Sequence, residues 1–121
     1  MQPLKLSTLI SEKQIAERVE QLGSVLTDKF RNKEGLVAIC ILKGSFVFFS
    51  DIIRSIDMDL SCEFLGVSSY NGGTKSSGEV KMTLDLTTPV EGKHLLLIED
   101  IVDTGLTMNY LVKTLSQRKP K

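Results

Sequence analysis

Hydrophobic residues recur at helical spacing in three stretches of the chain, which predicts three amphipathic helices. The first begins after Ser11, whose spacing to Gln14 has the S-x-x-Q form of a capping box, and it stops by Gly35. The second is expected over residues 46–56 and the third over residues 107–118. The residues expected on the inner faces are Ile15, Val19, Leu22, Leu26 and Phe30, then Phe46, Phe49, Ile52, Ile53 and Ile56, then Met108, Leu111, Val112 and Leu115.

Apolar runs between these helices predict strands. Residues 36–42 are all apolar and rich in β-branched types, which is typical of a parallel strand covered on both faces, and residues 94–98 predict a second buried strand. Residues 62–70 and 79–86 are strand-like neighbours, joined by the glycine-rich polar stretch 71–78, which we expect to be a long, mobile loop. The order of elements predicts an α/β fold with a mainly parallel, Rossmann-like sheet flanked by helices.

Length and charge limit the number of domains and the classes of ligand that are expected. With 121 residues, the chain is expected to form one domain, residues 1–121. Its 15 basic residues balance 15 acidic ones, so no bulk field attracts nucleic acid or an anionic membrane, and a phosphate ligand would have to be held locally. Neither a signal-peptide pattern nor an apolar run of membrane-spanning length is present, and a cytosolic protein is expected.

The cysteines and the single histidine do not suggest a metal or catalytic site. Cys40 and Cys62 each lie in an apolar run without CxxC or zinc spacing, so both are expected to be reduced thiols in the core. His94 begins a predicted strand, and we expect it to be structural.

Both buried strands end in chemically unusual sequences, at the place where ligands bind in open parallel sheets. Lys43-Gly44-Ser45 follows the first strand. The second is followed by two adjacent acids, Glu99 and Asp100. Carboxylates of this kind can accept hydrogen bonds from the two hydroxyls of a ribose and help to hold a hydrated Mg²⁺.

A phosphate site is predicted at the start of the last helix. Free N–H groups and the positive end of the helix dipole favour an anion there, Thr104 and Thr107 add hydroxyl donors, and Gly105 allows close backbone approach. The chain contains neither GxxxxGK[ST] nor GxGxxG, so the ligand is not expected to be held as in P-loop or dinucleotide-binding proteins. Sugar, phosphate and metal are thus implied together.

Residues 95–107, Leu-Leu-Leu-Ile-Glu-Asp-Ile-Val-Asp-Thr-Gly-Leu-Thr, resemble the phosphoribosyl-pyrophosphate signature of the type I phosphoribosyltransferases. Lys43-Gly44-Ser45 is similar to the pyrophosphate loop of that family. Ser69-Tyr70 with the following loop resembles the flexible hood of its hypoxanthine–guanine branch. The motifs occur in the family's order, and the chain is similar to the N-terminal part of a 6-oxopurine phosphoribosyltransferase.

The resemblance implies the type I phosphoribosyltransferase fold, truncated at the C-terminus, and a role in purine salvage. The implied reaction transfers the 5-phosphoribosyl group from phosphoribosyl pyrophosphate to hypoxanthine or guanine, gives IMP or GMP and pyrophosphate, and depends on Mg²⁺. The implied partners are the donor and a 6-oxopurine base, without nucleic acid or membrane, in a cytoplasmic homodimer or homotetramer.

The resemblance also implies roles for individual residues. Asp103 would be the general acid/base facing N7 of the purine, and the peptide joining Lys43 to Gly44 would be cis. Ser69 and Tyr70 would belong to a flexible lid that excludes water. The remaining implied contacts are Glu99 and Asp100 with the ribose hydroxyls and Mg²⁺, Lys43, Gly44 and Ser45 with pyrophosphate, and Asp103, Thr104, Gly105, Leu106 and Thr107 with the 5-phosphate.

Family members continue beyond the signature helix through strands that carry the base pocket, and no residue here matches that part. The chain is therefore expected to be either a fragment of a longer enzyme or a short protein that binds the donor without efficient catalysis, such as a phosphoribosyl-pyrophosphate sensor. A flavodoxin-like receiver domain is a further alternative, against which the Thr-Gly-x-Thr helix start argues. Leu106 is bulkier than the glycine of many relatives.

Overall fold

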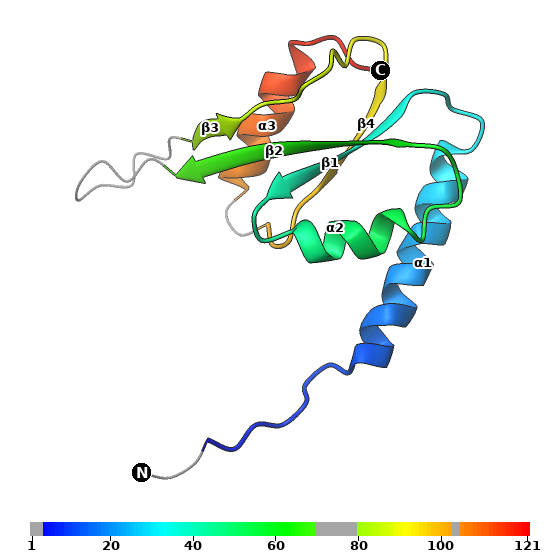
Figure 1. The fold of residues 1–121 in the computed structure, drawn as a ribbon, viewed down its shortest axis with the longest axis vertical. Helices are drawn as coiled ribbons and strands as arrows, with labels where there is room; N and C mark the ends of the chain where they lie inside the picture. The colour runs from blue at the N-terminus through cyan, green and yellow to red at the C-terminus, as the bar shows by residue number, and fades with distance from the viewer. Residues whose placement is uncertain (1–3, 70–79, 103–104) are drawn as a thin grey trace.

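A computed structural model describes residues 4–69, 80–102 and 105–121, which form a sheet flanked by helices (Figure 1). The strands predicted at residues 36–42 and 94–98 are confirmed with the predicted bounds. The elements of the described residues are α1 (Glu12–Phe30), β1 (Leu36–Leu42), α2 (Phe46–Ile53), β2 (Ser61–Ser69), β3 (Val80–Leu84), β4 (His94–Ile98) and α3 (Leu106–Ser116).

The strands form a sheet in the order β3-β2-β1-β4. β1 pairs in parallel with β2 on one side and with β4 on the other, whereas β2 and β3 are antiparallel. The prediction of a mainly parallel sheet is therefore confirmed, with the one antiparallel pair lying where residues 62–70 and 79–86 were expected to be neighbours.

The central strand β1 is buried on both faces, as its unbroken apolar run predicts. Ala38 and Cys40 point into a core formed with α1 and α2, while Val37, Ile39 and Ile41 point into a second core closed by α3. Side chains alternate across a strand, so consecutive residues must enter different cores. The result is a sheet covered by α1 and α2 on one face and by α3 on the other.

The start of α1 confirms the predicted capping box. The Ser11 amide donates to Gln14 Oε1 at 2.8 Å, and the Gln14 amide donates to Ser11 Oγ at 3.1 Å. Later in the helix, Gly23 passes so close to the backbone of Ser55 that a side chain at this position would collide with it. α1 can therefore approach the end of α2 only because residue 23 is glycine.

Some of the residues predicted to face the core are exposed instead. The exposed fractions of Ile15, Phe46 and Val112 are 52%, 60% and 51%. Ile15 lies in the first turn of α1, Phe46 is the first residue of α2 beside the open strand ends, and Val112 lies about 100° around α3 from the buried Leu111. Helical spacing gives the direction of an apolar face but not how far the neighbouring elements cover it. The predicted inner-face residues that are buried are Val19, Phe30, Phe49, Ile52, Ile56, Leu111 and Leu115.

Both cysteines are free, but only one belongs to the core. Cys40 is buried, whereas Cys62 is exposed, so the prediction of a buried Cys62 is wrong. Cys62 is the second residue of β2, near the start of this strand. His94 has a packing role, since its ring meets that of Phe30 edge-on at 6.3 Å between centroids.

A buried carboxylate that the sequence analysis did not single out fastens the segment between β3 and β4 to the sheet. Glu63 of β2 is 7% exposed. It accepts hydrogen bonds from the hydroxyls of Thr87 and Thr88 at 2.9 and 2.7 Å. The bond from Thr88 is the main reason why the pKa of Glu63 lies below its usual value.

No membrane-crossing helix occurs among the described residues, since none of their helices combines the necessary length with the necessary apolarity.

Candidate active site at the ends of β1 and β4

Two neighbouring strands bring the two predicted ligand-binding motifs to one edge of the sheet. β1 and β4 run in parallel, with Cys40 level with Ile98. Lys43 therefore follows the end of one strand, and Glu99 follows the end of the other, on the same side of the molecule (Figure 1).

Gly44 and Asp100 are in direct contact across this edge. A side chain at position 44 would occupy the place of the Asp100 carboxylate, so glycine leaves this carboxylate where it lies. The contact joins the predicted pyrophosphate turn to the predicted ribose and metal acids. Residues 56 positions apart in the sequence thus lie side by side.

The turn after β1 is tied to the core at one end and open to solvent at its tip. Lys43 and Gly44 are exposed, whereas Ser45 is 0% exposed. The hydroxyl of Ser45 donates to the carbonyl of Ile41 at 2.5 Å. Of the three residues predicted to hold pyrophosphate, Lys43 and Gly44 are thus presented to a ligand in this structure, and Ser45 is not.

The non-proline cis peptide predicted between Lys43 and Gly44 lies one residue earlier. It joins Leu42 to Lys43. Neither bond precedes proline, so no local feature of the sequence distinguishes one peptide of this turn from the next.

The two acids after β4 are held in a tight local arrangement. Glu99 Oε1 accepts from the Asp100 amide at 3.0 Å, and Asp100 Oδ1 accepts from the Ile101 amide at 2.7 Å. Asp100 is exposed and Glu99 is half-buried. Their carboxylates are therefore oriented by backbone donors before any ligand arrives.

Their environments move the two pKa values apart. Burial, followed by the hydrogen bond with the Asp100 carboxylate and its negative charge, raises the pKa of Glu99. The hydrogen bond from Glu99 and that from the Ile101 amide lower the pKa of Asp100. Asp100 is thus the member of the pair that keeps its negative charge as the pH falls.

The start of α3 is the third part of the predicted site. Gly105 precedes the helix with φ of 82°, a left-handed conformation that favours glycine. A Cβ added at this residue would lie 4.0 Å from Asn109 Nδ2, which is an ordinary contact. The backbone amide of Asn109 donates to the carbonyl of Gly105 at 2.9 Å. Leu106 is half-exposed and Thr107 is partly buried.

Part of the predicted site lies outside the described residues. This applies to Asp103, predicted as the general acid/base, to Thr104 in the phosphate loop and to Tyr70 in the lid. Ser69 is the last residue of β2, which ends at the same edge as β1, and it pairs with Val80 of β3. The described strands on either side of residues 70–79 are therefore antiparallel neighbours.

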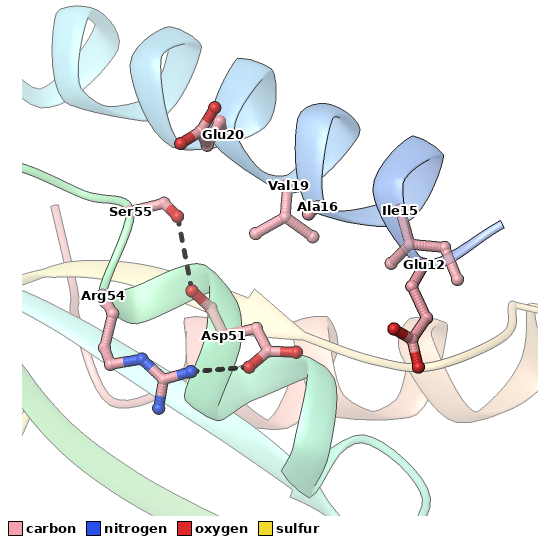
Figure 2. Close-up of a pocket in the computed structure, with 8 residues that line it drawn as sticks. All are labelled: Glu12, Ile15, Ala16, Val19, Glu20, Asp51, Arg54 and Ser55. Atoms are coloured by element: carbon pink, nitrogen blue, oxygen red, sulfur yellow. Dashed lines mark hydrogen bonds and ion pairs between the residues drawn. The ribbon is translucent and has the colours of Figure 1, made fainter.

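Two cavities of the described residues differ in their relation to this site. A pocket of about 400 Å³ lies between α1 and α2, where Figure 2 shows Ile15, Ala16 and Val19 facing an ion pair of Asp51 and Arg54 at 2.7 Å. This pocket lies away from the strand ends. Another, of about 480 Å³, adjoins the turn and is lined by Leu42, Lys43, Gly66, Val67, Thr83 and Leu84.

Comparison with known proteins shows the family of the chain. Residues 7–121 match the model of the phosphoribosyl transferase domain. The chain belongs to this family. The resemblance seen at residues 43–45 and 95–107 is thereby confirmed over most of the chain.

Several similar curated proteins are named hypoxanthine-guanine phosphoribosyltransferase. The chain is 47% identical over 115 residues to the hypoxanthine-guanine phosphoribosyltransferase of Dictyostelium discoideum, covering 93% of this chain and 64% of that protein. It is 49% identical over 113 residues to the enzyme of the same name from Bacillus subtilis, covering 93% and 62%. The chain thus spans less than two thirds of the length of these relatives.

Solved structures confirm the predicted fold. A hypoxanthine phosphoribosyltransferase from Staphylococcus aureus superposes with a TM-score of 0.87 at 43% identity, covering 95% of this chain and 62% of that one. A hypoxanthine phosphoribosyltransferase from Trypanosoma cruzi, solved as a ternary substrates complex, gives 0.84 at 39% identity, covering 93% and 65%. The mainly parallel sheet flanked by helices is that of the phosphoribosyltransferases.

Proposed function

We propose that this chain carries the donor-binding part of a purine-salvage phosphoribosyltransferase. It would bind phosphoribosyl pyrophosphate and transfer the 5-phosphoribosyl group to hypoxanthine or guanine, giving IMP or GMP and pyrophosphate. The contact between Gly44 and Asp100 carries the proposal, because it joins the turn suited to pyrophosphate and the acids suited to ribose. The names of the relatives support the choice of a 6-oxopurine as acceptor.

The donor would lie across the three parts of the site. Its 5-phosphate would bind at the start of α3, at Gly105, Leu106 and Thr107 together with the predicted Asp103 and Thr104, where backbone N–H groups and the helix dipole favour an anion. In addition, Glu99 and Asp100 would accept hydrogen bonds from the ribose hydroxyls, and Lys43 and Gly44 would hold the pyrophosphate.

Glu99 and Asp100 also fit a divalent cation. Asp100 is exposed and its pKa is lowered, so it presents a charged oxygen ligand beside a second carboxylate. In the described part of the chain no three His, Cys, Asp or Glu residues gather into a larger set. A pair of carboxylates suits Mg²⁺, which retains several waters and takes further ligands from substrate phosphates. When bound, the ion would neutralise the charge growing on the departing pyrophosphate.

The residues of this chain would assist a substitution at the ribose carbon. The bond from that carbon to a pyrophosphate oxygen breaks while the bond to a purine nitrogen forms, and positive charge builds on the ribose. Lys43 would stabilise the leaving group, and Asp103 is proposed to exchange a proton with N7 of the purine. The lid predicted at Ser69 and Tyr70 would keep water from the cationic ribose.

The setting of the reaction is part of the same proposal. Likeness to hypoxanthine-guanine phosphoribosyltransferases supports purine salvage, and a cytoplasmic location and assembly as a homodimer or homotetramer are further predictions. No residue of this chain is assigned to reading the purine base.

Calorimetric titration of the chain with phosphoribosyl pyrophosphate, with and without Mg²⁺, tests the proposal. We expect binding that requires Mg²⁺ and is lost in the double variant Glu99→Ala/Asp100→Ala. Turnover of hypoxanthine or guanine, with Asp103→Asn as the control, then separates a complete catalytic unit from a donor-binding part or sensor. Absence of donor binding by the natural chain would refute the proposed function.

A further inference from the structure

Ser45 lies at the point where the turn that carries Lys43 and Gly44 joins the core. Its exposed fraction is 0%, whereas both preceding residues are exposed. A residue without exposed surface cannot contact a ligand directly. Any part that Ser45 takes in ligand binding must therefore act through its neighbours.

The hydroxyl of Ser45 closes the turn. It donates to the carbonyl of Ile41 at 2.5 Å, so the hydrogen bond spans the three residues between them, including Lys43 and Gly44. The Sγ of Cys40 lies 3.4 Å from the same hydroxyl oxygen. Ile41 is 1% exposed and pairs with Leu65 of β2, so the turn is fastened to the most buried strand of the sheet.

The direction of this bond is unusual for a serine at the start of a helix. Serine at this position ordinarily accepts a hydrogen bond from a backbone amide of the first helical turn. Ser45 precedes α2 but makes no such bond with its side chain. Its carbonyl accepts from the Phe49 amide at 2.7 Å, while its hydroxyl points back to the strand. The side chain thus holds the turn rather than capping the helix.

We propose that Ser45 is a positioning residue for the pyrophosphate group of the donor. By binding the Ile41 carbonyl, it holds the turn so that Gly44 meets Asp100 and both Lys43 and Gly44 are open to the ligand. This inference rests on the proposed function. It replaces the direct contact between Ser45 and pyrophosphate that the sequence suggests.

Two ligands distinguish positioning from general stability. Pyrophosphate would need the turn, whereas ribose 5-phosphate would need only the acids and the start of α3. In calorimetric titrations of the full chain with Mg²⁺, Ser45→Ala is expected to weaken pyrophosphate binding about tenfold, on the scale of one buried hydrogen bond, and to change ribose 5-phosphate binding less than about twofold.

Matched variants show what causes a split, meaning a loss of pyrophosphate binding without a loss of ribose 5-phosphate binding. Ser24→Ala makes the same change at an exposed position of α1 and should leave both affinities unchanged. Cys40→Ala removes the thiol beside Ser45 but keeps the hydroxyl bond, so it should lower the melting temperature without producing the split. Ser45→Cys keeps a similar size with a weaker donor, and we expect a smaller loss confined to pyrophosphate.

The outcomes separate this inference from the proposed function. If the natural chain binds both ligands and Ser45→Ala weakens both equally, or neither, the positioning role is wrong while the donor site stands. If Cys40→Ala produces the same split, packing rather than the hydroxyl bond holds the turn, and the inference is again overturned. If the natural chain binds neither ligand, the proposed function fails and the positioning role fails with it.

Discussion

The two strand exits that form the site are built in different ways. The turn after β1 is closed by a side chain that is itself part of the core, since Ser45 is buried and bonded to Ile41. The exit of β4 consists of an exposed and a half-buried acid that are bonded mainly to their own backbone. The first exit depends on packing for its geometry and the second on local hydrogen bonds. We therefore expect substitutions at the two exits to weaken ligand binding for different reasons.

The largest effect is expected where the two exits touch. Gly44→Ala places a methyl group against the Asp100 carboxylate, so one of the two must move. Because Asp100 is exposed, its carboxylate or the turn can shift, and such a misplacement of ligand-binding groups leads us to expect a loss of pyrophosphate affinity of about tenfold to hundredfold in calorimetric titrations.

Gly105→Ala is the matched control for this glycine. Its side chain would meet only Asn109 Nδ2, at an ordinary contact distance of 4.0 Å, so the expected cost comes from the left-handed φ. This variant should weaken the binding of ribose 5-phosphate rather than that of pyrophosphate. If both glycine variants weaken the same ligand, the division of the site between the two exits is wrong.

Within the exit of β4, Asp100 is expected to matter more for Mg²⁺ than Glu99. The pKa of Asp100 is lowered and that of Glu99 is raised, so Asp100 carries the more persistent charge. Asp100→Asn should weaken Mg²⁺-dependent donor binding by roughly tenfold or more, on the scale of other changes at metal sites, and Glu99→Gln should weaken it less. Titration of Mg²⁺ at a fixed donor concentration measures both. Equal losses would contradict the assigned difference in charge.

At the exit of β1, the charge of the exposed Lys43 is expected to contribute less to pyrophosphate affinity. Lys43→Met removes the charge of a side chain that stands in solvent, where ion pairs are worth little, so pyrophosphate affinity should fall about fivefold. The melting temperature should not change. Lys43→Arg, which keeps the charge, should restore most of the affinity, and its failure to do so would point to backbone binding alone.

The smallest effect on ligands is expected from a carboxylate away from both exits. Glu63 has a lowered pKa because Thr88 and Thr87 donate to its ionised form. Its contribution to stability is therefore present above the pKa of the unfolded chain and is lost as the pH falls through the lower folded value. Glu63→Gln should remove this pH dependence in thermal melts between neutral and acid pH and leave donor affinity unchanged. An identical acid profile in the variant would contradict the assignment.

The sequence predicts the arrangement of the chain better than the details of its surface. The unbroken apolar run of β1 and the capping box at Ser11 are strong local signals, and both are confirmed. The exposure of Phe46 and Val112 depends on which elements cover a helix, which spacing does not encode. Nor does a Lys-Gly-Ser turn reveal which way the serine hydroxyl points, because that depends on a carbonyl in the strand behind it.

In the candidate site, too, local patterns were predictable from the sequence and contacts between distant segments were not. The acids and the helix start after β4 form a recognisable pattern, so their place at a strand end was predictable from the residues. Their contact with Gly44 was not, because it depends on the pairing of β1 with β4 and on the register of that pair.

The most direct test of the account is a crystal structure of this chain with Mg²⁺ and phosphoribosyl pyrophosphate. We predict pyrophosphate at Lys43 and Gly44, the ribose hydroxyls and the metal at Glu99 and Asp100, and the 5-phosphate at the start of α3. A donor bound elsewhere, such as the pocket between α1 and α2, or a pyrophosphate group that does not touch the turn after β1, would contradict the claim that the two strand exits form one site.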